Sequence, residues 1–121
     1  MITSLQNQGI KNVVKLSKSS ERKAQQLFVI EGARELSLAM QSGYEIVTAY
    51  VCRDLLVHSD YADVLGSLSE RIVFDISVEV FRKMAYRENS DGIVALAKSK
   101  SHTLADITLS PNPFIIILES V

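Results

Sequence analysis

The chain has 121 residues, enough for one compact domain, and with 47% hydrophobic and 22% charged residues it has the composition of a folded rather than a disordered protein. Its single cysteine excludes an internal disulfide. The sequence shows neither the apolar core of a signal peptide nor an apolar run near the roughly 18 residues that span a bilayer, and the cytoplasm is therefore the expected location. The net charge of −1 hides an asymmetry: residues 1–34 carry six basic and two acidic side chains, whereas residues 35–121 carry seven basic and twelve acidic ones, so the N-terminal third is expected to face a polyanion.

The N-terminal segment predicts a helix at about residues 7–17, because Ile10, Val13 and Val14 recur at helical spacing. The pair Ser19-Ser20 supplies hydroxyls that can cap a second, short helical turn over residues 22–26. Two consecutive helical segments are therefore expected before the first strand.

The next segment reads as strand, helix and strand. Residues 27–30 are apolar and predict the first strand, and residues 32–41 have a helical apolar face that Gly43 is well placed to end. Residues 46–52 predict the second strand. Cys52 lies within its apolar run and is expected to be a small core residue rather than a nucleophile.

The third part of the chain continues the alternation. A helix is predicted near residues 61–68 and a short strand at 71–75, and Ser77 is expected to cap a helix that runs to Met84. Residues 92–97 predict the fourth strand. Alternating helices and strands of this kind favour an α/β fold, a small α/β/α sandwich with helices on both faces of a mixed central sheet.

The composition changes after residue 97. Residues 98–113 are polar, end in two prolines and are expected to be a linker. The five apolar residues Phe114–Leu118 suit a strand that is buried on both faces. One interpretation adds this strand to the edge of the first sheet. We prefer the other, in which residues 114–121 begin a second domain.

Basic side chains recur every three or four residues near the N-terminus, at Lys11, Lys15, Lys18 and Arg22. If the helical register persists through Ser19-Ser20, the four lie along one stripe, where like charges repel by roughly 0.2–0.5 kcal/mol per pair. Phosphate groups would relieve that repulsion. The alternative is a solvated face balanced by Glu21, and both interpretations remain open at this point.

No constellation of catalytic residues stands out. His58 and His102 have no partner at metal-ligand spacing, and the five glycines are scattered rather than gathered in a phosphate-binding loop. Further cations are available for binding: Lys23 and Arg34 flank residues 28–32, and Arg87 lies in a polar loop. The sequence indicates a binding module rather than a complete enzyme.

Residues 2–36 resemble the start of the SpoU/TrmH-type RNA ribose methyltransferases. That family opens with a similar order of polar, basic and Phe-x-x-Glu-Gly elements, which here fall on Ser4, Asn7, Ile10, Lys11, Leu16, Arg22, Lys23, Phe28, Glu31 and Gly32. Residues 90–97 look like the strand that closes the family's N-terminal domain, with Ser-Asp-Gly in place of the proline form of the turn. Residues 113–121 resemble the opening strand of its catalytic domain.

The resemblance implies that residues 1–97 form a substrate-binding domain with the sandwich fold of ribosomal and kink-turn-binding proteins, and that it grips structured RNA, with ribosomal RNA as the expected target. It implies a full-length homodimeric enzyme that transfers a methyl group from S-adenosylmethionine to a ribose 2′-hydroxyl. No catalytic, cofactor or metal residue is carried over to this chain, which alone is expected to be inactive. The expected RNA contacts are Lys11, Lys15, Lys18, Arg22, Lys23, Arg34 and Arg87.

Two other classes remain as alternatives. One is a stand-alone RNA-binding protein with a ribosomal-protein-like fold and no methyltransferase attached. The other is a protein-interaction or dimerisation module in which the basic residues are incidental. Salt-sensitive affinity for RNA would separate both RNA-binding readings from the third class.

Overall fold

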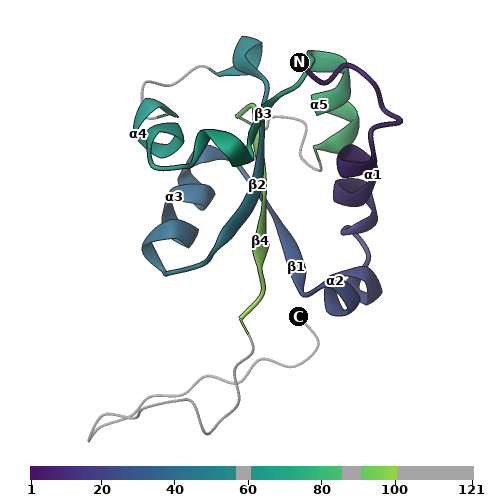
Figure 1. The fold of residues 1–121 in the computed structure, drawn as a ribbon, viewed down its shortest axis with the longest axis vertical. Coiled ribbons are helices and arrows are strands. Elements are labelled where there is room, and N and C mark those ends of the chain that lie inside the picture. The colour runs from purple at the N-terminus through teal and green to yellow at the C-terminus, as the bar shows by residue number, and fades with distance from the viewer. Residues whose placement is uncertain (57–60, 86–90, 101–121) are drawn as a thin grey trace, which may run out of the picture.

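The computed structural model describes residues 1–56, 61–85 and 91–100. Within these ranges the helices lie in two layers on either side of one sheet (Figure 1). In chain order the elements are α1 (Gln8–Lys15), α2 (Ser19–Gln25), β1 (Leu27–Glu31), α3 (Ala33–Gln41), β2 (Ile46–Val51), the 3-10 turn η1 (Arg53–Leu55), α4 (Tyr61–Gly66), the 3-10 turn η2 (Glu70–Ile72), β3 (Val73–Asp75), α5 (Val78–Met84) and β4 (Ile93–Lys98).

The sheet has the strand order β1-β4-β2-β3 and is mixed. Strand β4 runs antiparallel to both β1 and β2, whereas β2 and β3 are parallel. Every residue of β4 except Lys98 is buried, as expected for an apolar strand that lies between two others and is covered on both faces. The predicted α/β/α sandwich with a mixed central sheet is therefore confirmed.

The two faces of the sheet bury separate clusters of apolar side chains. Helices α1, α2 and α5 cover one face, and α3 and α4 cover the other (Figure 1). The first cluster joins residues of α1 and α5, such as Ile10 and Phe81, to Tyr50 and Val94 of the sheet. The second cluster centres on Leu36 of α3. Cys52 is buried in the first cluster, which confirms its prediction as a core residue.

Two local predictions at helix starts were tested by the structure, with opposite results. The Ser77 hydroxyl accepts a hydrogen bond from the Val80 N–H at 3.3 Å and caps α5 as predicted. The predicted cap at Ser19-Ser20 is wrong, since both serines lie inside the first turn of α2 and the N-cap position is Lys18, which makes no side-chain cap bond. A hydroxyl can cap a helix only from the residue before the first turn, and α2 begins at Ser19, three residues before the predicted start at residue 22.

The predicted strand over residues 71–75 is only partly right. Its first part belongs to the 3-10 turn η2, and β3 itself spans Val73–Asp75. The Ser69 side chain accepts a hydrogen bond from the Arg71 N–H at 3.3 Å and holds the start of that turn. A side-chain bond to the backbone two residues ahead offers the chain an alternative to the strand ladder.

Gly32 allows β1 to pass directly into α3. Its backbone has φ 100° and ψ 149°, a conformation that other residues rarely adopt. Its N–H donates to the Ile93 carbonyl of β4 at 3.0 Å, so the pairing of β1 with β4 extends to Gly32 itself, directly before the helix. Gly32 is therefore the single residue between β1 and α3.

Candidate nucleic-acid interface

Lys11 and Lys15 are exposed on the outer side of α1. The helix buries Ile10 and Val13 against the sheet, so its lysines are left on the solvent side. The Asn7 side chain accepts hydrogen bonds from the Gly9 and Ile10 N–H groups and caps this helix. Two cations expected to contact RNA therefore lie on one rigid, capped helix.

The chain changes direction between α1 and α2, so the four-residue stripe is not continuous. Helix α1 ends at Lys15, and Lys18, the N-cap of α2, has the extended conformation φ −90° and ψ 133°. The condition for the stripe, a helical register maintained into α2, is therefore not met. Lys18 and Lys23 are exposed on their own turn and helix, next to but not in line with the lysines of α1.

Arg22 has a structural role that the sequence did not reveal. Its guanidinium donates hydrogen bonds to the Leu16 and Ser17 carbonyls, at 3.0 and 2.9 Å, just beyond the last turn of α1. These carbonyls have no partner within the helix, and a cation also complements the negative end of the helix dipole. Arg22 thus fixes α2 against the end of α1.

Arg34 is separated from the other candidates. It is exposed in the first turn of α3, on the face of the sheet opposite to α1 and α2 (Figure 1). Arg87 lies outside the described residues, as do His58, His102 and the predicted strand at 114–121. The structure therefore brings Lys11, Lys15, Lys18, Arg22 and Lys23 together on one side and leaves Arg34 apart from them.

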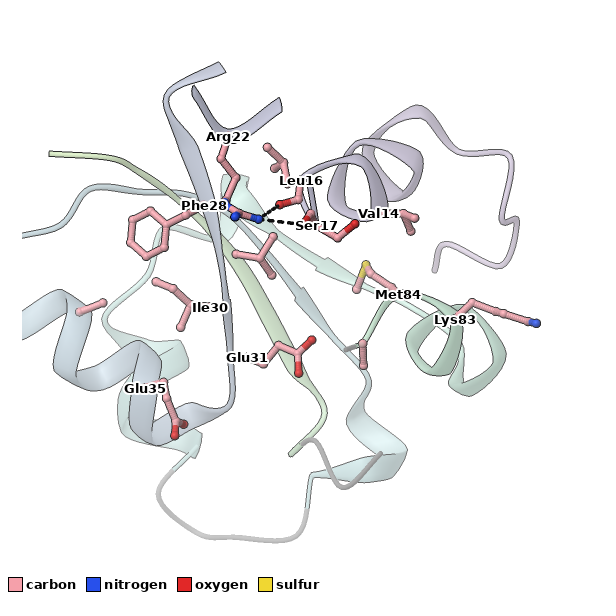
Figure 2. Close-up of a pocket in the computed structure, with 13 residues that line it drawn as sticks. Val14, Leu16, Ser17, Arg22, Phe28, Ile30, Glu31, Glu35, Lys83 and Met84 are labelled. Carbon is pink, nitrogen blue, oxygen red and sulfur yellow. Dashed lines mark hydrogen bonds between the residues drawn. The ribbon is translucent and has the colours of Figure 1, made fainter. Parts of the chain in front are cut away.

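A groove of about 990 Å³ runs along β1, the edge strand of the sheet. Figure 2 shows Arg22, Leu16 and Ser17 at one end of the groove and Glu31 and Glu35 at the other. Its α1–α5 side carries apolar side chains, including Val14 and Met84, and is bordered by Lys83, whose amino group points away from the groove. The groove is a largely apolar surface with charged groups at its rim.

Two cations of this region, Arg82 and Lys83, were not among the residues predicted from the sequence. Both are exposed in the last turn of α5. The only signal in the sequence was a pair of basic residues at a helix end, and such a pair is commonly explained by the helix dipole. Their position beside α1 depends on how α1 and α5 pack against each other.

No group of three or more His, Cys, Asp or Glu side chains that could hold a metal ion occurs among the described residues. Burial raises the pKa of Tyr50, whose ring packs in the core between the sheet and α1. No helix in the described part of the chain is long and apolar enough to cross a membrane.

Replacing Arg22 by alanine is expected to lower the free energy of unfolding by about 2 kcal/mol, because two charge-assisted hydrogen bonds to helix-end carbonyls are lost. Lys23→Ala is the matched control, since the exposed Lys23 side chain makes no such bond, and it should change stability by less than about 0.5 kcal/mol. Urea unfolding of both variants measures the difference. Equal stabilities would show that the Arg22 bonds contribute nothing to the fold.

The fold and the charge distribution define a small α/β/α domain with its exposed N-terminal cations on one helix layer. The sequence profile of the MRM3-like substrate binding domain matches residues 7–95. No curated protein matches the sequence closely enough to count as a relative.

Solved structures agree with this match. An RNA 2′-O ribose methyltransferase is 34% identical with a TM-score of 0.78 over 91% of this chain, and this chain spans 42% of its length. The AdoMet-bound rRNA methyltransferase from Sinorhizobium meliloti is 22% identical (TM-score 0.73), with 90% of this chain covered and 40% of that one. The SpoU methyltransferase AviRb from Streptomyces viridochromogenes is 16% identical (TM-score 0.70), with 86% and 38% covered. The last two show the fold alone.

The chain belongs to the MRM3-like substrate-binding domain family, and it corresponds to the N-terminal substrate-binding domain of SpoU/TrmH-type RNA 2′-O-ribose methyltransferases. The resemblance stated from the sequence is confirmed. The chain spans less than half the length of each of these solved proteins.

Proposed function

We propose that this domain holds structured RNA, with ribosomal RNA as the expected target, for a SpoU/TrmH-type methyltransferase in the cytoplasm. The observation that carries the proposal is the exposed group of cations on α1, at its junction with α2 and on α2 itself: Lys11, Lys15, Lys18 and Lys23. In a domain of a substrate-binding family, phosphates are the natural partners of such a group. These side chains position the RNA backbone and do not read its bases.

The chemistry of the whole enzyme lies outside this domain in our proposal. S-adenosylmethionine, when bound, would supply the methyl group for a ribose 2′-hydroxyl, and we assign no residue of this chain to it. Residues 1–97 are then the RNA-binding domain and 98–113 a linker, while 114–121 begin the catalytic domain. A homodimer is expected for the full-length protein. Arg87 remains an expected RNA contact. Arg34 was expected from the sequence as well, but it lies on the opposite face of the sheet from α1 and is left out of the proposed RNA surface.

Reversing two lysines tests the RNA surface. Lys15→Glu combined with Lys18→Glu should weaken binding of an RNA stem–loop roughly 60-fold at about 0.1 M salt, since each phosphate contact adds about 0.9 to the slope of log K against log salt. The slope should become shallower by about 2. Fluorescence anisotropy over a salt series measures both quantities, and circular dichroism confirms the fold.

The neutral pair Lys15→Gln and Lys18→Gln is the companion variant, because it removes the contacts without adding repulsion, and it should lose the same slope. Unchanged affinity in a folded double reversal would overturn the surface assignment. If the unmodified domain shows no salt-sensitive affinity for RNA, the protein-interaction class takes its place.

The methyltransferase part of the proposal is tested on the source transcript. A reading frame that continues past Val121 into the family's Asn-x-Gly…Arg motif would support a substrate domain of a methyltransferase. A stop codon directly after Val121 would instead favour the stand-alone RNA-binding protein.

A further inference from the structure

The end of α5 lies beside α1, although the two helices are more than 60 residues apart in the sequence. Both helices bury apolar side chains in the same cluster, Val13 from α1 and Phe81 and Met84 from α5. The residues left on the solvent side of α5 include Arg82 and Lys83, both exposed. Packing of the two helices therefore forms one outer surface from two distant segments.

The groove along β1 is bordered by residues of α1, α2 and α5. Val14 of α1, Arg22 of α2 and Lys83 of α5 all line it (Figure 2). A basic residue from the first third of the chain and one from its last third thus border the same groove. Helix α5 lies in the same layer as α1, which carries Lys15, and α2, which Lys18 precedes (Figure 1).

The two helix layers differ strongly in charge. Residues 8–25 and α5 together carry seven basic side chains and two acidic ones, a net charge of +5. Helices α3 and α4, on the other face of the sheet, carry one basic and two acidic side chains, a net charge of −1. The near-neutral charge of the whole chain conceals this difference, which favours approach of a polyanion from the α1–α5 side only.

The cations of this layer are not neutralised within the part of the chain that the structure describes. The ion pairs there join Arg53 to Asp75 and Lys98 to Glu45, and neither pair involves the layer. Glu79 lies one turn before Arg82 and Lys83 and is paired with neither. Phosphates would compensate a layer whose seven cations outnumber its two acidic side chains and form no ion pair among the described residues.

We propose that Arg82 and Lys83 extend the RNA-contacting surface from α1 across to α5, so that the phosphate backbone lies over the α1–α5 layer while the α3–α4 layer faces away from it. This inference rests on the proposed function, because it adds contacts to the same RNA surface. The competing explanation is that Arg82 and Lys83 serve only the dipole of α5. That role would not change the salt dependence of RNA binding.

The test compares charge reversals in the 121-residue chain, with an RNA stem–loop as the probe and a salt series as the readout. Arg82→Glu combined with Lys83→Glu should weaken binding roughly 60-fold at about 0.1 M salt and reduce the slope by about 2. Arg82→Gln combined with Lys83→Gln should reduce the slope equally and keeps the test valid if the double reversal fails to fold.

Single reversals supply the matched control. Lys83→Glu and Arg71→Glu change the net charge by the same amount, but Arg71 is exposed in η2, before the strand at the opposite edge of the sheet from β1. Lys83→Glu should reduce the slope by about 1, and Arg71→Glu should leave it unchanged. Equal losses for the two would mean that only net charge matters and would overturn the inference.

Failure of the inference can be told from failure of the proposed function. If reversing Lys15 and Lys18 weakens RNA binding but changing Arg82 and Lys83 does not, the RNA surface ends at α1 and the inference is wrong, while the proposed function stands. If the unmodified chain shows no salt-dependent RNA binding, both are wrong.

Discussion

Replacing Gly92 by alanine is expected to lower the free energy of unfolding by about 4 kcal/mol, more than any other substitution considered for this domain. Gly92 has φ +89°, where a residue with a side chain is strained by about 1–2 kcal/mol. An added Cβ would lie 2.9 Å from the Cys52 carbonyl oxygen and 3.2 Å from the Leu55 backbone. Overpacking of this kind costs a further 1–3 kcal/mol or so, since backbone atoms cannot rotate away.

The strain that an alanine at position 92 would introduce lies where the central strands β2 and β4 meet. The Cys52 N–H, at the end of β2, donates to the Gly92 carbonyl at 2.8 Å, immediately before β4 begins. Moving either peptide to accept the methyl group would break the first bond of the β2–β4 pairing. The loss should therefore appear as reduced stability of the whole domain and not as local fraying.

Gly66→Ala is the matched control for this prediction. Gly66 lies at the end of α4 with nothing within 4 Å of an added Cβ, so its replacement should change stability by less than about 1 kcal/mol, in the stabilising direction. Urea denaturation of both variants, with unchanged m-values, gives the comparison. Similar stabilities for the two variants would contradict the proposed crowding at Gly92.

The second large effect is expected in the core that α3 covers. Leu36 is fully buried, and Leu36→Ala should destabilise the domain by about 3 kcal/mol, through lost burial and the cavity that remains. Leu38, two residues away in the same helix, has 53% of its surface exposed, so Leu38→Ala should cost less than about 0.5 kcal/mol. Because both variants replace leucine by alanine in the same helix, the difference between their free energies of unfolding measures the effect of burial and not of helix propensity.

The Leu36→Ala variant is also expected to lose stability without losing RNA affinity. It belongs to the cluster on the α3–α4 face, whereas the proposed RNA surface lies on the α1–α5 face. Leu36→Ala should therefore reduce the midpoint of urea denaturation while the folded fraction keeps its RNA affinity and salt dependence. A changed salt slope in this folded variant would argue against an RNA surface confined to α1 and α5.

Local features of the sequence were sufficient to predict most elements. Apolar runs bounded by turn residues located the four strands within a few residues, because a strand covered on both faces needs apolar side chains throughout. Ser77 marked the start of α5, because a hydroxyl at the N-cap has a partner only three residues away. The same reasoning failed at Ser19-Ser20, where two adjacent hydroxyls left the start of the helix ambiguous.

The arrangement of the site depended on contacts between distant residues. The strand order β1-β4-β2-β3 pairs segments that are far apart, and no local pattern encodes it. That order, with the helices it carries, leaves Arg34 on the opposite side from Lys11. It also brings Lys83 of α5 to the groove that Arg22 of α2 lines.

Composition and patterns a few residues long were enough to predict the fold class, the family resemblance and the excess of cations in the first 34 residues. Which of those cations share a surface depended on the tertiary structure. It assigned Arg22 to the end of α1, set Arg34 apart and added Arg82 and Lys83 to the α1–α5 layer. The physical reason is that burial of Val13, Phe81 and Met84 in one core sets how α1 and α5 meet, and the charges on their outer sides follow that packing.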